Sequence, residues 1–302
     1  MKKIPANQKQ KKPKMVNVGI IGTGNIGTDL LLKIQRSKVL QCRMFAGINA
    51  DSEGIKRAIE MGIPTSTKSI DVFKKYPSIV DIVFDATSAS AHKINAPIFK
   101  KLGIFTIDMT PARIGKMCVP LINLDSCLNI PNVNMITCGG QATIPIIAEI
   151  LKVHPETEYV EIVSSISSKS AGIATRDNID EYTQTTAESI REFSGIKSAK
   201  AIIILNPAEP PILMNNTIYA LIKNPNLPKI KKGIKRIVAE IKKYVPGYEI
   251  ILGPISENNR LIVMMRVRGR GDFLPDYAGN LDIINAAAIV IAEQYAKNKL
   301  MS

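Results

Sequence analysis

A glycine-rich turn near the start of the chain constrains its fold more than any other feature of the sequence. Gly22, Gly24 and Gly27 form a G-x-G-x-x-G pattern, which follows an apolar, β-branched run at residues 16–21 and precedes a helical pattern at residues 26–34. In such a unit the first glycine makes the tight turn, the second lets the backbone approach a pyrophosphate, and the third lets the helix pack on the strand. The pattern therefore predicts a dinucleotide-binding unit, with a glycine-rich turn that binds no ligand as the alternative.

Strand and helix patterns alternate through the first half of the chain. The strand candidates are residues 16–21, 44–48, 79–84, 104–107, 119–122 and 133–136. The helix candidates are residues 26–34, 92–102 and 142–153. Alternation of this kind predicts a doubly wound parallel sheet with helices on its faces, the Rossmann-type α/β fold.

The pattern changes near residue 155. The later strand candidates are residues 159–165, 201–205, 250–252 and 261–267, and the later helix candidates are 177–193, 230–244 and 281–297. Fewer helices per strand predict an α+β second domain, and the apolar face of the last helix predicts that it packs back on the first domain. We therefore divide the chain into a basic tail, a dinucleotide-binding domain that ends after the nucleophile, an α+β catalytic domain and a returning helix, at residues 1–14, 15–154, 155–275 and 276–302.

The charge and hydropathy of the sequence argue against a nucleic-acid partner and against a membrane span. Six lysines and no acid occur in residues 1–14, which predicts a disordered basic tail. The net charge is +14, but only 5% of the residues are aromatic, and the lysines of residues 229–243 have the spacing of a solvated helix face, so we expect no nucleic-acid partner. No apolar run approaches the roughly 20 residues of a membrane helix, and no signal sequence is visible. We expect a cytoplasmic protein without a membrane partner.

Cys138 follows the last strand candidate of the first domain and precedes Gly139, Gly140 and a helix candidate. A thiol at a helix N-terminus is stabilised as a thiolate by the helix dipole, and neighbouring backbone N–H groups are suited to hold an oxyanion. The alternative is a small buried side chain beside a helix cap. A dinucleotide-binding unit in the same chain favours the nucleophile, because a cysteine thiohemiacetal needs a hydride acceptor.

The other cysteines, the two histidines and Asn49 give weaker indications of a functional site. The four cysteines form no C-x-x-C pair and only His92 and His154 accompany them, so we expect no metal site. We interpret His154 as structural and His92 as a helix-cap or surface residue, with an approach of His92 to the cofactor cleft as the alternative. Cys138 is thus left without an evident general base. Asn49 stands where the fingerprint expects an acid for the ribose, and this favours NAD over NADP only moderately.

Seven longer segments are distributed over nearly the whole chain: GIIGTGNIGTDL, VFDATSASAH, IDMTPARIG, NVNMITCGGQATIP, SISSKSAGIATRDNIDEYT, LNPAEPP and YAGNLDIINAAA. They resemble the acylating (acetylating) acetaldehyde dehydrogenases of meta-cleavage pathways for aromatic hydrocarbons. The resemblance implies NAD⁺ and coenzyme A as co-substrates, acetyl-CoA as product and a dimerising α+β domain. It also implies a hetero-oligomer in which 4-hydroxy-2-oxovalerate aldolase hands over acetaldehyde through a channel.

The resemblance also assigns roles to individual residues. Cys138 matches the acyl-thioester nucleophile, and Asn280 matches a nicotinamide-site asparagine, although a helix cap is the simpler interpretation of Asn280. The matches to the dinucleotide turn are Thr23, Gly24, Asn25 and Ile26. The matches to a second NAD-contacting segment, which otherwise reads as a solvated loop, are Ser168, Lys169, Ser170, Ala171, Gly172, Ile173, Ala174, Thr175 and Arg176.

Three departures from the family pattern bear on the expected activity. Ile173-Ala174 replaces Pro-Gly, Asn49 replaces Asp, and Asn216 replaces the aspartate implicated in assisting the cysteine. Two rival functions follow: a phosphorylating semialdehyde-type dehydrogenase, and a non-catalytic NAD-binding partner of the aldolase.

Overall fold

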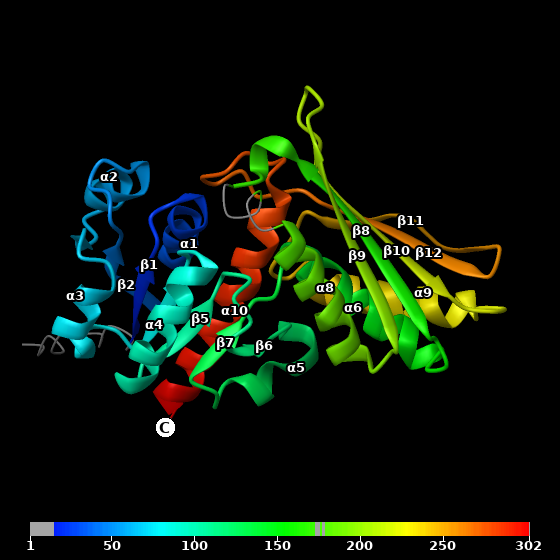
Figure 1. The fold of residues 1–302 in the computed structure, drawn as a ribbon, viewed down its shortest axis with the longest axis horizontal. Helices are drawn as coiled ribbons and strands as arrows, with labels where there is room; N and C mark the ends of the chain where they lie inside the picture. Colours follow the sequence, from blue (N-terminus) through cyan, green and yellow to red (C-terminus); the bar gives the residue numbers. More distant parts are fainter. Residues whose placement is uncertain (1–14, 173–175, 177–178, 302) are drawn as a thin grey trace, which may run out of the picture.

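Two β-sheets, bridged by a long C-terminal helix, organise the chain (Figure 1). This computed structural model describes residues 15–172, 176 and 179–301. The predicted tail at residues 1–14 therefore lies outside the described residues. Among the described helices, none combines the length and the apolar character that a membrane span requires.

The first sheet has seven parallel strands in the order β3-β2-β1-β4-β5-β7-β6. Its strands are β1 (Val16–Ile21), β2 (Leu40–Ala46), β3 (Thr65–Ser66), β4 (Ile82–Asp85), β5 (Phe105–Asp108), β6 (Lys116–Met117) and β7 (Asn132–Asn134). Its helices are α1 (Asn25–Gln35), α2 (Glu53–Glu60), α3 (Ile70–Lys75), α4 (Ala89–Lys101) and α5 (Pro120–Cys127), with a 3-10 turn η1 (Pro77–Ile79). The order reverses at β1, as in a doubly wound sheet, which confirms the predicted Rossmann-type fold.

One strand prediction in this domain is wrong. Residues 119–122 do not form a strand, because α5 begins at Pro120. Proline at the first helical position has a φ suited to the helix and lacks an N–H that would need a partner. Asn123 supports the turn, since its side-chain oxygen accepts from the Val119 N–H at 2.9 Å and its amide donates to the Met117 carbonyl at 2.9 Å. The apolar run of residues 119–122 thus belongs mostly to a helix.

The second sheet is mixed, with strand order β11-β12-β10-β8-β9. Its strands are β8 (Tyr159–Ser167), β9 (Ser198–Asn206), β10 (Met214–Leu221), β11 (Tyr248–Glu257) and β12 (Arg260–Val267). The helices are α6 (Cys138–Val153), α8 (Ile179–Ser194) and α9 (Leu227–Ile241), with a 3-10 turn η2 (Ser168–Ser170) after β8. Only β8 and β9 pair in parallel, which confirms the predicted mixed sheet of an α+β domain.

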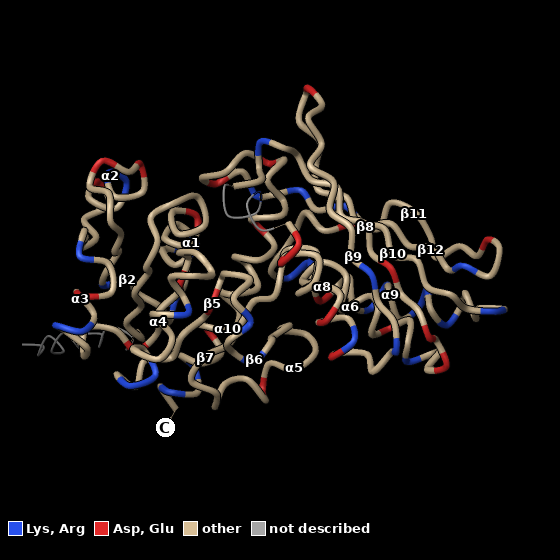
Figure 2. Tube along the Cα trace, in the orientation of Figure 1, with Lys and Arg blue, Asp and Glu red and all other residues tan. Residues whose placement is uncertain are grey.

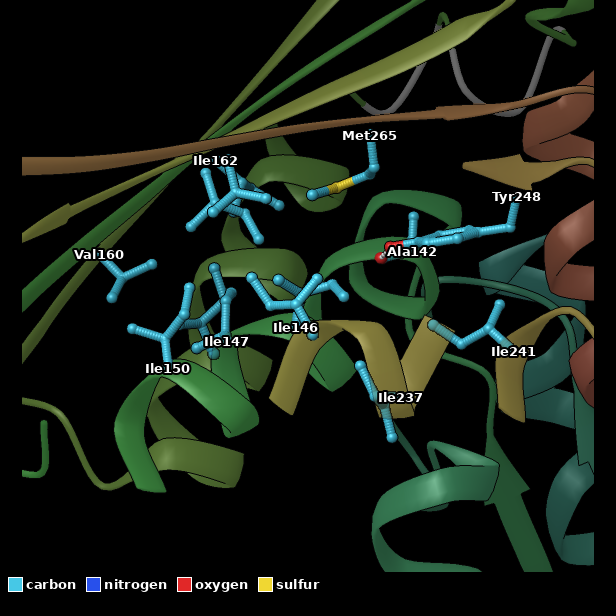
Figure 3. Packing of buried hydrophobic residues seen from close by; sticks show 14 of the residues in the cluster. Ala142, Ile146, Ile147, Ile150, Val160, Ile162, Ile237, Ile241, Tyr248 and Met265 are labelled. Atoms are coloured by element: carbon cyan, nitrogen blue, oxygen red, sulfur yellow. Dashed lines mark hydrogen bonds between the residues drawn. The ribbon is translucent and has the colours of Figure 1, made fainter. Parts of the chain in front are cut away.

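The core of the second domain lies between this sheet and its helices. Figure 3 shows Ile147 and Ile150 of α6 beneath Ile162 and Val160 of β8, and the same buried cluster includes Ile237 and Ile241 of α9. Full burial of such side chains contributes about 1.5–3 kcal/mol each. The Tyr248 hydroxyl donates to the Ala142 carbonyl of α6 at 2.7 Å. Helix α6, which begins with Cys138, is therefore fixed against the second sheet; the boundary at residues 154 and 155 stays a prediction.

The outer face of α9 carries the second lysine cluster. Ile230, Ile234, Ile237 and Ile241 are buried, whereas the lysines between residues 229 and 243 are exposed (Figure 2). The alternation has the period of an amphipathic helix on the surface of a globular protein.

Helix α10 (Gly279–Met301) returns to the first domain, as predicted. Its buried residues divide between the two cores: Ile283 packs with the second domain, and Ile291 and Ala292 pack with the first. An ionic contact also holds it there, because the Nζ of Lys33 in α1 lies 2.6 Å from the carboxylate of Asp282 in α10. The first turn of α10 is thus positioned beside the glycine-rich turn.

Candidate active site

The glycine-rich turn has the shape that a pyrophosphate requires. A Cβ added to Gly27 would lie 1.9 Å from the Gly22 carbonyl oxygen, so that only glycine lets α1 pack this closely. A Cβ added to Gly24 would meet no heavy atom within 4 Å, so that the outer side of the turn is open. No side chain of the described residues caps α1. The helix therefore presents N–H groups and partial positive charge to the open side, as anion binding requires.

A pocket lies where the first sheet meets the second domain. Its empty space is about 770 Å³, part of it open to solvent. Three of the predicted site residues line it: Ile26 of the glycine-rich turn, Cys138 at the start of α6 and Asn280 at the start of α10. Thr87 and Thr110, which follow β4 and β5, contribute hydroxyls and were not predicted. The pocket thus brings together residues that are distant in the sequence.

Helix α6 begins at Cys138, four residues before the predicted start at residue 142. Thr137 caps it, because its Oγ1 accepts from the Gly140 N–H at 3.0 Å. The Gly139 N–H donates to the hydroxyl of Tyr182 at 3.1 Å. A Cβ at Gly139 would lie 2.5 Å from that hydroxyl and 2.8 Å from the Oγ of Ser164, which requires glycine at this position. Both predicted oxyanion donors therefore already have partners within the protein.

The thiol of Cys138 does not have the lowered pKa that its place at a helix start suggested. Burial raises the pKa of the Cys138 thiol, and this effect outweighs the hydrogen bonds from Tyr182 and from the Gly139 N–H, which lower it. The Cys138 sulfur lies 3.5 Å from the Tyr182 hydroxyl oxygen. Tyr182 is a site residue that the sequence did not reveal, since EYTQTT reads only as part of a helix.

Asn216, which replaces the family aspartate, is buried in β10 behind this pair. Its Oδ1 accepts a hydrogen bond from Ser164 at 2.7 Å. Its Nδ2 is buried without a partner among the described residues. Ser164 in turn interacts with Tyr182. A chain of polar side chains therefore connects Asn216 to the Cys138 sulfur.

Asn280 lies within the first turn of α10 and does not precede it as a cap. Its side-chain amide donates to the Ser170 carbonyl at 3.3 Å, and its Oδ1 is buried without a partner among the described residues. An unpartnered buried acceptor beside the pocket fits a carboxamide ligand. The contact also joins the first turn of α10 to the predicted second cofactor segment.

The second cofactor segment is only partly described. Ile173, Ala174 and Thr175 lie outside the described residues, whereas Ser168, Lys169 and Ser170 form η2 and Gly172 is exposed. Arg176 donates to the Ser168 carbonyl at 2.5 Å, and Lys169 lies 2.6 Å from Glu209. These two cations are therefore engaged by the protein itself.

His92 is not a surface or cap residue, and that interpretation was wrong. It is fully buried, with Nδ1 2.9 Å from Asp85 and Nε2 3.4 Å from Asp108. Burial alone lowers the pKa of His92, but the hydrogen bond with Asp85 and the charges of Asp108 and Asp85 outweigh it and raise the pKa. Asp85 also accepts from Thr87, and Asp108 from the Thr110 N–H at 2.8 Å. The cluster thus fixes both pocket loops.

Comparison with known proteins identifies the family. Residues 138–275 match the family model described as prokaryotic acetaldehyde dehydrogenase, dimerisation, and residues 17–137 match the NAD binding domain of semialdehyde dehydrogenase. The chain is 53% identical to an acetaldehyde dehydrogenase of Spirochaeta aurantia over 284 residues, 94% of this chain and 96% of that protein. It is 51% identical to one of Geobacillus stearothermophilus, over 94% of this chain and 97% of that protein.

The chain belongs to the acetylating acetaldehyde dehydrogenase family. It is accordingly an oxidoreductase that acts on aldehydes and uses a nicotinamide cofactor. The dehydrogenase fold is shared more widely: aspartate semialdehyde dehydrogenase II of Vibrio cholerae matches with a TM-score of 0.65 at 14% identity, over 94% of this chain and 99% of that one. Cys138 stands at the junction of the two matched regions of the chain.

Proposed function

We propose that the protein oxidises acetaldehyde, and other short aliphatic aldehydes, to the coenzyme A thioester with NAD⁺ as acceptor. The observation that carries this proposal is the shared pocket, which is lined by Cys138, by Ile26 of the glycine-rich turn and by Asn280. A nucleophile beside a dinucleotide site is the arrangement that thiohemiacetal oxidation needs.

In the first step the Cys138 thiol loses its proton to solvent, and the thiolate adds to the aldehyde carbonyl to form a thiohemiacetal. When bound, NAD⁺ supplies the hydride acceptor. The Cys138 adduct is then a thioester, and the thiol of coenzyme A displaces the acyl group and regenerates Cys138. Apolar lining residues such as Ile136, Ile166 and Ile284 exclude water from this thioester.

The chain's own residues fit the cofactor. The turn at Thr23, Gly24, Asn25 and Ile26 would hold the pyrophosphate on its open side. The buried, unpartnered Oδ1 of Asn280 would accept from the carboxamide of the nicotinamide. Residues 168–176 would contact the same ligand next to Asn280. The Oδ1 of Asn49 already accepts from the Asp51 N–H at 2.9 Å, so the amide of Asn49 would face the ribose.

The proposed assembly is a homodimer within a hetero-oligomer that contains 4-hydroxy-2-oxovalerate aldolase. The match of residues 138–275 to a dimerisation model supports the homodimer. The aldolase and coenzyme A rest on the sequence resemblance, and a cytoplasmic location stays a prediction from the sequence. Copurification of the tagged chain with that aldolase tests the assembly.

The test of the activity is NADH formation from acetaldehyde, with coenzyme A, with phosphate and with neither. We expect turnover with coenzyme A only, and none in Cys138→Ala. Turnover with coenzyme A that survives in Cys138→Ala would sink the mechanism.

The same assay separates the rival functions. Turnover with phosphate would favour a phosphorylating semialdehyde-type dehydrogenase, since residues 17–137 match the NAD binding domain of semialdehyde dehydrogenase. The uncharged lining of the pocket, as far as the described residues go, argues against a substrate with an anionic group. NAD binding without an NADH burst in a single turnover would indicate a non-catalytic partner of the aldolase.

A further inference from the structure

The hydroxyl of Tyr182 contacts both the Cys138 sulfur and the first turn of α6. It lies 3.5 Å from the Cys138 sulfur and accepts the Gly139 N–H at 3.1 Å. The tyrosine comes from α8, its side chain is buried, and it lines the pocket. Tyr182 is therefore a polar group aimed at the reacting sulfur, and no role has yet been given to it.

We propose that Tyr182 is a catalytic residue whose O–H donates a hydrogen bond to the Cys138 thiolate, while Ser164 and Asn216 fix the position of that hydroxyl. This role deepens the proposed function and rests on it. The proton of the thiol leaves to solvent, and Tyr182 keeps its own proton and stabilises the sulfur anion. The group thus supplies part of what the family carboxylate was expected to supply.

The protonation of Tyr182 suits a donor. Burial, together with the neighbouring sulfur, raises the pKa of the Tyr182 phenol well above its ordinary value, so that the proton stays on the ring oxygen at neutral pH. The Gly139 N–H occupies a lone pair of that oxygen, which leaves the O–H to find an acceptor. A thiolate 3.5 Å away is such an acceptor, since sulfur forms long hydrogen bonds.

The surroundings leave the thiolate few other sources of stabilisation. The described residues that line the pocket carry no charged side chain. They come from the loops after β4, β5 and β7, from β8 and from α1, α4, α6, α8 and α10. The contributions that lower the thiol pKa come from Tyr182 and from the backbone N–H groups of residues 138 and 139. Removing the Tyr182 hydroxyl therefore removes the side-chain contribution.

Asn216 differs from a carboxylate in what it offers to Ser164. An ionised carboxylate can only accept hydrogen bonds, so the Ser164 hydroxyl would always donate its hydrogen bond to it. A half-turn of the Asn216 amide presents Nδ2 in place of Oδ1, and Ser164 is then free to donate to Tyr182. The Nδ2 that now has no partner gains one by this turn. Asn216 then donates to Ser164, Ser164 donates to Tyr182, and Tyr182 donates to the Cys138 sulfur.

The test is the pH dependence of Cys138 alkylation by iodoacetamide, read by peptide mass with Cys138→Ala as the blank. In Tyr182→Phe we expect the midpoint to rise by about one to two pH units, because a hydrogen bond to a charged group is lost. Alkylation near neutral pH then slows by about 10- to 100-fold. Tyr295→Phe, whose ring stacks on Phe105 away from the pocket, is the matched control and should keep the wild-type midpoint.

A midpoint in Tyr182→Phe equal to that of wild type would overturn the proposal. If Tyr182→Phe does not fold, Ser164→Ala takes its place: a midpoint raised above wild type supports the proposal, and an unchanged midpoint overturns it. Because alkylation needs neither NAD nor coenzyme A, its outcome is separate from the turnover assay. Wild type that fails to turn over acetaldehyde would end the proposed function while leaving the alkylation result readable.

Discussion

Ser164 of β8 and Asn216 of β10 are register partners in the second sheet, and the Ser164 hydroxyl donates to the Asn216 Oδ1 at 2.7 Å. Both side chains are fully buried, and Ser164 lies against Gly139 in the first turn of α6. Buried polar groups that meet in this way stabilise only while each finds its partner. A charge placed in this pair would be fully buried.

Asn216→Asp should therefore destabilise the protein increasingly as the pH rises. Burial is expected to raise the pKa of the new carboxyl, so the native state holds the proton more tightly than the unfolded state, and stability falls with rising pH. We expect a loss of about 1–3 kcal/mol at pH 8 and less at pH 5, measured by urea unfolding. Asn215→Asp is the control on the same strand, because Asn215 faces the other way and accepts from Arg266 at 3.2 Å. An equal loss at both pH values in Asn216→Asp would contradict the account.

His92→Gln should lower the free energy of unfolding by about 3–5 kcal/mol, because the buried carboxylates of Asp85 and Asp108 lose their partner. It should also raise the KM for NAD, since these carboxylates hold the loops of Thr87 and Thr110 at the pocket. Urea unfolding and initial rates measure the two effects. His154→Gln, at the end of α6, should leave the KM unchanged; a KM in His92→Gln equal to wild type would refute the role of the cluster.

The same cluster predicts the pH dependence of the wild-type protein. The pKa of His92 is raised in the folded state. Its contribution to the free energy of unfolding is therefore fully present below the pKa of the unfolded state, and it is lost as the pH rises through the pKa of the folded state. Burial raises the pKa of Asp108 to about 6, so the native state also favours its protonated form and loses stability as the pH rises towards that value. Both groups act in one direction, so the free energy of unfolding of wild type, measured with urea at pH 5, 6.5 and 8, should fall as the pH rises. The fall should persist in His92→Gln, because loss of the His92 charge raises the pKa of Asp108 further. A wild-type free energy of unfolding that does not fall over this range would show that the cluster does not titrate there.

Alanine substitutions at Gly24 and Gly27 should distinguish an effect on cofactor binding from an effect on stability. Gly24→Ala places its Cβ in open space, so we expect stability within about 0.5 kcal/mol of wild type but weaker NAD binding, because the methyl group stands where the backbone meets the phosphates. Gly27→Ala would push a Cβ against the Gly22 carbonyl and should lower stability as well. Thermal unfolding and NAD titration distinguish the two variants. Unchanged NAD affinity in Gly24→Ala would argue against a pyrophosphate at this turn.

The parts of the structure that could be predicted from the sequence are those that local sequence patterns determine. The glycine pattern fixes the conformation of its own turn, and Cys138 is recognisable because its glycines and its helix are adjacent to it. Strand β10 has no such signal, since Asn215, Asn216 and Thr217 interrupt its apolar alternation, and its residues are buried only by the partners on either side.

Tertiary contacts account for what the sequence did not show. The Cys138–Tyr182 contact joins residues 44 positions apart, and the His92 cluster joins the ends of β4 and β5. The expected fall in the thiol pKa failed for the same reason: the helix start is a local effect, whereas burial depends on every element around the sulfur.

The central claim, that Cys138 carries the acyl group, is tested most directly by trapping. Wild type mixed with acetaldehyde and NAD⁺, without coenzyme A, should form one equivalent of NADH and gain the mass of one acetyl group on the peptide that contains Cys138, and coenzyme A should then remove that mass. Stoichiometric NADH without an acetyl group on Cys138, or an acetyl group that coenzyme A does not remove, would contradict the account.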